Sequence, residues 1–372
     1  MVTDIRIPFE NITRQYDQIK EEISAAIAEV LPTGKYVLGA QLTAFEAEFA
    51  AYHQASYCAG ISNGTEALHL ALLACGVGPG DEVITVPNTY VATVFAISYT
   101  GATPVFADVD PLTFNIDPAD VERKITTRTR AILPVHLYGQ CVDMDSLMEI
   151  ARRHNLYVVE DAAHAHGALY KGRKAGSLGH IACFSFYPTK VMGAYGDGGA
   201  VTTSDPELYD RVKVLRYMGQ HKKYVHEIVG YQQRLGEIQA GVLRVKLRHL
   251  DGWIDLRRKW GALYSASLMG TKVTPPFEAE DMRHVYYMYT ILAPRRDELQ
   301  TYQAEHGVGS QPVYPLEVPF QPAYAHMGHQ KGDFPVADRQ VDEILCLPMF
   351  PELTEAEVME VVQHIKNFYA GR

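Results

Sequence analysis

Two short apolar runs in this chain end beside side chains that could do chemistry together. The run 156–159 is followed by an acidic pair that includes Asp161, and the run 181–186 is followed four residues later by Lys190. Short apolar runs of this kind are typical of buried strands. Two buried strands that finish in an acid and a lysine place opposite charges at one edge of a sheet, which is where open α/β sheets bind ligands.

An amine and a carboxylate in this arrangement suit catalysis with pyridoxal phosphate (PLP). A lysine amine condenses with the PLP aldehyde, and a carboxylate keeps the pyridine nitrogen protonated so that the ring accepts electrons from a carbanion. A structural ion pair at a strand end would use the same two residues, because such pairs also perturb charges. Lys190 and Asp161 are therefore candidate catalytic residues whose assignment depends on the rest of the chain.

A phosphate site is predicted where the stretch Asn63–Glu66 joins a strand to a helix. Free backbone N–H groups and the helix dipole favour an anion at such a point, and Ser185 could add a hydroxyl donor. A helix N-cap would also explain Asn63 or Thr65 without any ligand. Together with Ser185, the stretch favours the phosphate interpretation.

One further side chain could face the same ligand. Tyr90 begins the helix after a strand and could place its ring on the pyridine, although a tyrosine there could equally pack in the core.

His164 and His166, with Glu160 and Asp161, could suggest a metal site. No third imidazole or cysteine follows at a usual ligand spacing, and no H-E-x-x-H motif is present, so no metal is expected.

The hydrophobic pattern predicts an α/β fold with a mostly parallel sheet covered by helices on both faces. Helices are expected over 11–31, 41–52, 65–74, 90–99, 144–154, 206–217 and 354–369, with a long amphipathic helix from residue 235. The seven expected strands cover residues 57–61, 82–87, 103–108, 131–136, 156–160, 182–186 and 200–203, and a further strand-like run covers 285–292. The long helix suggests a division into a large domain, 1–245, and a smaller α+β C-terminal domain, 246–372.

Composition excludes several classes of protein. A chain of 372 residues with 47% hydrophobic and 21% charged residues is typical of a globular protein of two domains. Its net charge of −10 argues against nucleic acid or an anionic membrane as a partner. The sequence contains no membrane-length apolar run and no signal peptide, and its five cysteines show no C-x-x-C spacing. A cytoplasmic protein with reduced, mostly buried thiols is expected.

Blocks around the two candidates, EDAAHAHGA, FSFYPTK and GAYGDGGAV, resemble signature segments of the nucleotide-sugar aminotransferases, the DegT-type family of fold type I PLP enzymes. Further similar segments follow in matching order over nearly the whole chain: IPFENITRQYDQIKEEI, ISNGTEALHLAL, PVHLYGQCVDMD and GDFPVADRQVDEILCLPMFPELTEAEV.

The resemblance implies roles for individual residues. Thr65, Glu66 (through its backbone) and Ser185 match positions that hold the PLP phosphate. Tyr90 matches an aromatic that stacks on the cofactor, and His164 matches a position near the cofactor's phenolic oxygen.

Two positions depart from the family pattern. Gln232 stands where an asparagine usually reaches the partner subunit's PLP phosphate; glutamine keeps the amide donor but is one methylene longer. The C-terminal loop carries Val313 before Tyr314-Pro315, where the family often has histidine. The resemblance nevertheless implies a homodimer with shared active sites.

By resemblance, the expected reaction is a transamination from L-glutamate to a nucleotide-linked keto-sugar, in which Lys190 both bonds PLP and moves the proton. The favoured acceptor is a dTDP-3-keto-6-deoxyhexose, in amino-deoxysugar biosynthesis for an antibiotic or a surface polysaccharide. The densest basic cluster, Arg216, His221, Lys222, Lys223 and Arg234, could bind the diphosphate or could be a solvated face.

Several alternatives remain open at the sequence level. A 4-keto nucleotide sugar or a keto-cyclitol could be the acceptor. A deoxysugar 3-dehydratase is disfavoured, because related dehydratases replace the lysine with histidine. A regulatory or binding protein that retains the fold is a further alternative, against which the intact set of Asp161, Ser185 and Lys190 argues.

Overall fold

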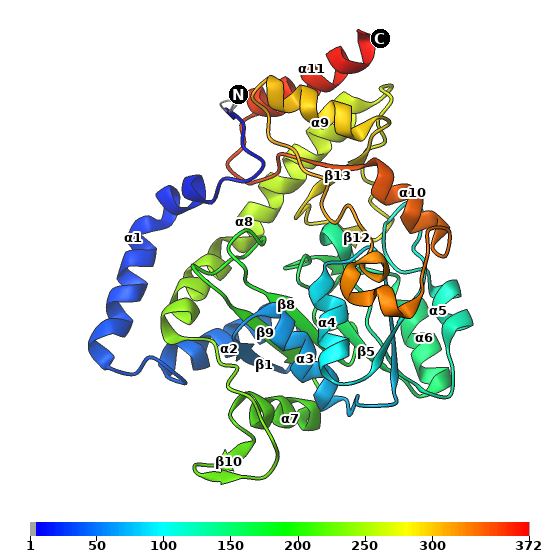
Figure 1. Ribbon diagram of the computed structural model, residues 1–372. Coiled ribbons are helices and arrows are strands. Elements are labelled where there is room, and N and C mark those ends of the chain that lie inside the picture. Colours follow the sequence, from blue (N-terminus) through cyan, green and yellow to red (C-terminus); the bar gives the residue numbers. More distant parts are fainter. Residues whose placement is uncertain (1–4, 372) are drawn as a thin grey trace.

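The computed structural model describes residues 5–371, which form an α/β protein around one seven-stranded sheet (Figure 1). The strands in spatial order are β1 (Tyr57–Ile61), β9 (Gly199–Thr203), β8 (Ile181–Ser185), β5 (Tyr157–Asp161), β4 (Thr129–Ile132), β2 (Glu82–Thr85) and β3 (Thr103–Phe106). β9 is antiparallel to both of its neighbours, and the other adjacent pairs are parallel. The predicted mostly parallel sheet is confirmed.

Helices cover both faces of the sheet. Because successive strand residues point to opposite sides, each strand contributes side chains to both buried faces. Val159, Ile181 and Val201 pack on one face against α3 (Gly64–Ala74), α4 (Val91–Tyr99) and α7 (Pro206–Arg216). Val158 and Ala182 contribute to the other face, against α2 (Ala40–Tyr52), α6 (Met144–His154) and α8 (Glu237–Leu268). Continuous apolar strands are what a sheet covered on two sides requires.

The long helix α8 crosses from the large sheet to a separate apolar cluster near the C-terminus. Its first half packs against α1 (Ile12–Val30), and its second half places Trp260 and Tyr264 in a core with β13 (Tyr289–Leu292), β14 (Ile344–Leu347) and α11 (Glu355–Ala370). The helix continues through Asp251-Gly252 because apolar side chains on both sides of that pair are buried. The proposed domain boundary near residue 245 lies within this helix, and the division into two domains stays a prediction.

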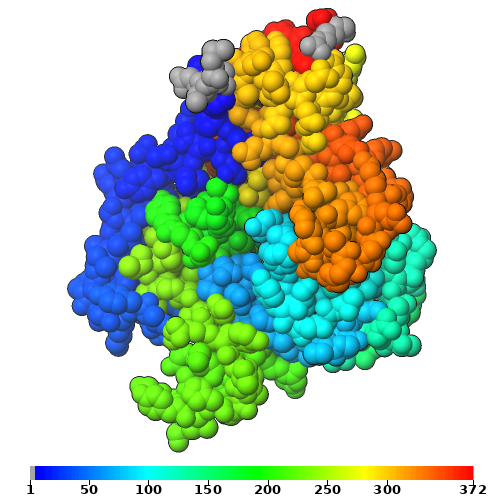
Figure 2. All heavy atoms as spheres, in the orientation of Figure 1, coloured from blue at the N-terminus to red at the C-terminus, as the bar shows by residue number. Residues whose placement is uncertain are grey.

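Several short elements were not predicted from the sequence. They are α5 (Pro118–Lys124), α9 (Arg296–Glu305), α10 (Pro335–Glu343), the strands β6 (Leu169–Tyr170), β7 (Arg173–Lys174) and β12 (Met282–Arg283), and the hairpin of β10 (Gln220–Lys222) and β11 (Val225–His226). The hairpin projects from the body of the molecule (Figure 2). Within residues 5–371, no helix is both long enough and apolar enough to cross a membrane.

Candidate active site

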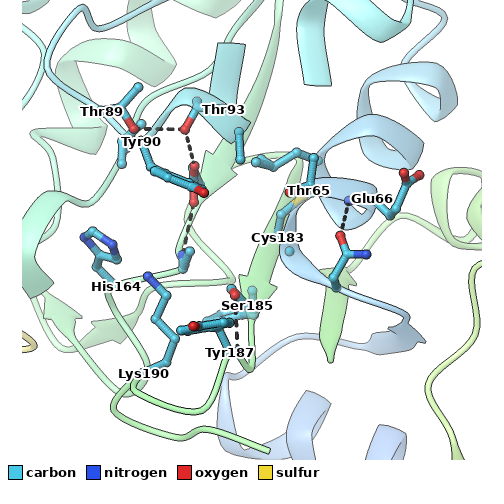
Figure 3. A pocket seen from close by; sticks show the side chains of 18 of the residues that line it. Thr65, Glu66, Thr89, Tyr90, Thr93, His164, Cys183, Ser185, Tyr187 and Lys190 are labelled. Carbon is cyan, nitrogen blue, oxygen red and sulfur yellow. Dashed lines mark hydrogen bonds between the residues drawn. The ribbon is translucent and has the colours of Figure 1, made fainter. Parts of the chain in front are cut away.

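The carboxyl ends of β5 and β8 bring the two predicted catalytic residues to one cavity. Asp161 is the last residue of β5 and pairs in register with Cys183 of the parallel neighbour β8. Lys190 lies in the loop after β8, where its backbone N–H donates to the Tyr187 carbonyl at 2.9 Å. Both residues line a cavity of about 630 Å³, into which the lysine side chain extends (Figure 3).

Asp161 is a buried carboxylate that accepts two hydrogen bonds from the described part of the chain, residues 5–371. The Thr93 hydroxyl donates to its Oδ2 at 2.8 Å, and the Ala163 N–H donates to its Oδ1 at 3.1 Å. Burial raises the pKa of Asp161 above its ordinary value, against the lowering influence of these bonds and of Lys190. A cationic group in the cavity would stabilise the buried negative charge of Asp161, and a protonated pyridine nitrogen is such a group.

Lys190 is half-buried, and its amine has an altered protonation equilibrium. Desolvation lowers the pKa of Lys190 to about 8, although the charges of Asp161 and Glu10 oppose the change. About a tenth of this amine is therefore uncharged at pH 7, and the uncharged form is the one that acts as a nucleophile or a general base. Its Nζ lies 4.5 Å from the centroid of the Tyr287 ring.

The amino end of α3 provides an anion site beside the cavity. Asn63 is the N-cap of this helix, and its side-chain oxygen accepts the Glu66 N–H at 2.9 Å. Gly64 and Thr65, the first two helical residues, have N–H groups without an acceptor inside the helix. The cap interpretation therefore holds for Asn63, and the free donors belong to Gly64 and Thr65 more than to Glu66.

Close backbone approach shapes this anion site. A Cβ on Gly64 would lie 2.6 Å from the Cβ of Ser185, so only glycine lets the helix start reach the end of β8. The Ser185 hydroxyl accepts the Tyr187 N–H at 3.3 Å, which leaves its own proton free to donate. Thr65, Glu66 and Ser185 all line the cavity, and their contact with a phosphate stays a prediction.

Tyr90 and His164 also line the cavity. Tyr90 caps α4 and is 55% exposed, so it is not a core aromatic. The His164 Nδ1 accepts the Tyr138 N–H at 3.2 Å, which assigns the ring proton to Nε2, 3.2 Å from the Tyr314 hydroxyl oxygen. Burial lowers the pKa of His164 far below its ordinary value, so the ring is neutral.

The cavity has the three kinds of group that PLP requires: helix-terminal donors for its phosphate, a carboxylate for its ring nitrogen and a lysine for its aldehyde. Within residues 5–371, no group of three or more His, Cys, Asp or Glu residues could hold a metal ion. The arrangement defines a PLP-dependent enzyme of fold type I.

The chain belongs to the DegT/DnrJ/EryC1/StrS aminotransferase family, which it matches over residues 17–366. Among curated relatives, it is 47% identical to a "pleiotropic regulatory protein" of Geobacillus stearothermophilus, over 98% of this chain and 99% of the relative. It is 44% identical to the dTDP-3-amino-3,4,6-trideoxy-alpha-D-glucose transaminase of Streptomyces venezuelae, over 98% and 96% of the two chains.

Solved structures agree with this assignment. S. venezuelae DesV, crystallised in complex with a ketimine intermediate, superposes with a TM-score of 0.96 at 44% identity, covering 98% of each chain. NtdA of Bacillus subtilis, with bound cofactor PMP, gives a TM-score of 0.90 at 30% identity, covering 98% of this chain and 86% of that one. The protein is an aminotransferase, and its cofactor is pyridoxal 5′-phosphate.

Gln232 is not among the residues that line the cavity of its own chain. It is exposed, in the segment before α8, and pairs with Tyr217 through an isolated antiparallel bridge. The structure thus leaves its side chain available to another molecule, and its role at a partner's phosphate stays a prediction.

The predicted basic cluster is only partly available to a ligand. Arg216 is buried and donates to the Glu46 carboxylate and the Gly60 carbonyl, so the diphosphate interpretation is wrong for this residue. His221 lies between the carboxylates of Asp210 and Glu227. Lys222 and Lys223 remain exposed on the projecting hairpin.

Several residues that line the cavity were not predicted from the sequence, Thr93 and Tyr287 among them. Thr93, which donates to Asp161, lies four residues after Thr89, and their hydroxyls are 2.9 Å apart. This Thr-x-x-x-Thr spacing was the available signal. Tyr287 comes from a distant part of the chain, and no local pattern connects it with the cavity, whereas Tyr314 lies in the C-terminal loop that the family pattern includes.

Proposed function

We propose that this aminotransferase moves an amino group from L-glutamate to the 3-keto carbon of a nucleotide-linked 6-deoxyhexose, with dTDP as the favoured nucleotide, in amino-deoxysugar biosynthesis. The observation that carries the proposal is the convergence of Asp161 and Lys190 on one cavity beside a helix amino terminus. The sugar class is supported by the name of the S. venezuelae relative, a transaminase of a dTDP-3-amino sugar.

Each side chain of the site has a defined task in this proposal. Bound PLP supplies an electron sink for negative charge that develops at the amino acid's α-carbon. Asp161 holds a proton on the ring nitrogen, and Thr93 fixes the orientation of that carboxylate. The Lys190 amine, with its pKa near 8, would take the α-proton from glutamate and deliver it to the C4′ carbon of the cofactor. The same groups act in reverse order on the keto-sugar.

The anionic acceptor needs positive charge beyond this cavity. Among residues 5–371, Lys190 is the single lysine or arginine that lines the cavity. Lys222 and Lys223, on the projecting hairpin, are cations that a diphosphate could contact if a second copy of the chain brought its hairpin to the cavity.

A homodimer with shared sites is therefore part of the proposal. Gln232 would donate its side-chain amide to the phosphate bound in the other copy. Large exposed apolar side chains near the hairpin, Tyr224 at 80% and Val229 at 91% exposure, support burial against a second copy. We expect sedimentation of the active enzyme to show a dimer, and an active monomer would contradict the role of Gln232.

A cytoplasmic location is proposed on the chemistry of the thiols. All five cysteines are buried and unpaired, as predicted, which is typical of a reducing compartment.

The substrate assignment is tested with purified enzyme, glutamate and a panel of 3-keto and 4-keto nucleotide sugars together with a keto-cyclitol. We expect the dTDP-3-keto-6-deoxyhexose to be converted with a higher kcat/KM than any other acceptor in the panel. Preference for a 4-keto sugar or for the cyclitol would replace the proposed acceptor without altering the cofactor chemistry.

A further inference from the structure

Tyr287 is the side chain that contacts the catalytic amine most directly without having a role in the proposed reaction. Its ring is 5% exposed, its centroid lies 4.5 Å from the Lys190 Nζ, and the same centroid lies 4.5 Å from that of the His164 ring. An ammonium group above an aromatic face is attracted by the negative charge of that face, more strongly when water is excluded.

The backbone next to Tyr287 has a strained conformation. The preceding residue, Tyr286, has φ of 46°, a left-handed conformation that is strained for a bulky residue. Such strain persists where surrounding contacts over-determine the conformation. Here it turns the chain between a residue that faces His284 and one that faces the cavity.

A buried arginine supplies one of these contacts. Arg257 of α8 is 5% exposed, and its Nη1 donates to the carbonyl oxygens of Tyr286 at 3.1 Å, Tyr287 at 3.3 Å and Met349 at 2.9 Å. Three backbone carbonyls share this one nitrogen, while the buried Nε has no partner within residues 5–371, so Arg257 holds the segment through Nη1.

The turn between β4 and α6 supplies a second anchor. The Val285 N–H donates to the Gly139 carbonyl at 2.9 Å, and a Cβ on Gly139 would lie 3.1 Å from the Tyr287 backbone nitrogen. Gly139 has φ of 111°, which glycine adopts without strain. The segment that carries Tyr287 is therefore held from two sides, by Arg257 and by the turn at Gly139.

We propose that Tyr287 is the positioning residue for Lys190: its ring receives the lysine amine whenever that amine is not bonded to the cofactor, and keeps it within the cavity between the two proton transfers. This role goes beyond the exchange of amino groups, because it concerns the interval in which the lysine is free and could turn away from the reacting carbon.

Other charged or titratable groups also face the amine, and the test has to separate their effects. Asp161 and the partly buried Glu10 of the N-terminal segment both favour the charged amine. His164 and His166, both buried and neutral, follow β5, and of the two only His164 is among the residues that line the cavity. None of these groups changes in variants at position 287, so a change in the amine can be assigned to the ring.

The test measures the pKa of the Lys190 amine in the full-length protein stripped of cofactor, from the pH dependence of its acylation, quantified by peptide mass spectrometry. Removing the ring with Tyr287→Leu should lower this pKa by about 1, the loss expected for a desolvated cation–aromatic contact. Tyr287→Phe retains the ring and should leave it close to wild type. Lys246, a buried lysine, provides an internal control, because its Nζ lies 4.3 Å from a different ring, that of Tyr195.

If the leucine variant does not fold, a series of residues at position 287 that share nearly the same shape provides the test instead. Phenylalanine with increasing ring fluorination at position 287 makes the ring face progressively less negative at nearly constant volume. The pKa of Lys190 should fall along this series while that of Lys246 stays constant. The same Lys190 pKa across the whole series would overturn the proposal.

In the holoenzyme, the half-reaction with α-deuterated glutamate gives an independent result. Tyr287→Leu should slow it by about 10–100-fold, with a larger deuterium isotope effect, because a poorly placed amine makes proton transfer limiting. Tyr289→Leu, which removes a core ring stacked on Tyr264, is the matched control for lost stability. Slowing of both variants to the same extent, with unchanged isotope effects, would show that Tyr287 is only structural.

Discussion

Glu160 and Asp161 are adjacent carboxylates on one strand, yet the structure uses them in opposite ways. Glu160 points to the same face of the sheet as Val158, where its oxygens accept from His136 Nε2 at 2.9 Å and from the N–H groups of Gly176, Leu178 and Gly179 at 2.6–2.8 Å. Asp161 points to the opposite face, accepts two hydrogen bonds and borders the cavity.

The surrounding donors account for the difference, since both residues are buried. For Glu160, burial raises the pKa, but His136 and the backbone donors outweigh it and bring the pKa below its ordinary value. For Asp161, burial dominates and the pKa is raised. A fully bonded carboxylate is a structural anchor, and this one holds the loop that leads into β8 and so to Lys190. An incompletely bonded carboxylate at a cavity is suited to a ligand.

The largest effect is expected for Lys190→Ala, at the cavity that Asp161 borders. Turnover should fall by about 10⁴-fold or more, because one residue supplies both the bond to PLP and the proton transfer. Lys246→Ala is the matched control: Lys246 is buried, and burial also lowers its pKa to about 8, but it does not line the cavity. Steady-state kinetics with glutamate should show full activity per folded molecule for the control, and full activity of Lys190→Ala would refute the mechanism.

Next in size is the pair Asp161→Asn and Glu160→Gln. Asp161→Asn should reduce the rate of the glutamate half-reaction by about 10²–10³-fold with little loss of stability, since a charge that stabilises the transition state is removed. Glu160→Gln should instead lower the free energy of unfolding by about 2–4 kcal/mol, because its amide would face backbone donors. Rapid-mixing kinetics and urea unfolding measure the two effects. The reverse pattern would show that the roles of the two faces are misassigned.

Lys190 should also make stability depend on pH. The folded amine of Lys190 loses its proton near pH 8, whereas the unfolded one does so near 10.5, so the unfolded chain binds more protons in between. The free energy of unfolding of the cofactor-free protein should therefore rise with pH from about 8 towards 10. Urea unfolding of Lys190→Met should show a weaker rise than wild type; an identical rise in both would assign the dependence to other groups, such as Lys246.

The smallest effect is expected for Thr93→Val, which keeps the shape but removes the hydroxyl that donates to Asp161. Loss of one hydrogen bond to a charged group should slow the half-reaction by about 10-fold, or roughly 1.4 kcal/mol. Thr89→Val leaves the Thr93–Asp161 bond in place and should have a smaller effect. Equal effects of the two substitutions would mean that orientation of Asp161 is not what Thr93 contributes.

Much of the fold followed from the sequence because buried parallel strands are continuous apolar runs bounded by turns. The strand Tyr57–Ile61 and the helix Met144–His154 have the predicted bounds. The strand predicted over 82–87 ends at Thr85, since the ladder stops before Pro87. The helix Arg296–Glu305 was missed because it buries only Leu299 and Gln303 and therefore has no clear apolar stripe.

The site was predictable where it depends on strand ends and not where it depends on tertiary contacts. Asp161 and Lys190 follow buried strands, and parallel neighbours necessarily end at the same edge. The capture of the Glu66 N–H by Asn63 depends on a side-chain rotamer, which no pattern specifies. Tyr287 lies in a run predicted as strand over 285–292, whereas β13 begins only at Tyr289, because the strained turn at Tyr286 directs Tyr287 to the cavity.

The central claim is that the cofactor bonds to the Lys190 amine at the carboxyl ends of β5 and β8, beside Asp161. Reduction of the PLP-loaded enzyme with borohydride makes that bond permanent, and peptide mass spectrometry then locates it. The account predicts one phosphopyridoxyl group per chain, on Lys190. A label on Lys246 or on any other lysine, or no label at all, would contradict it.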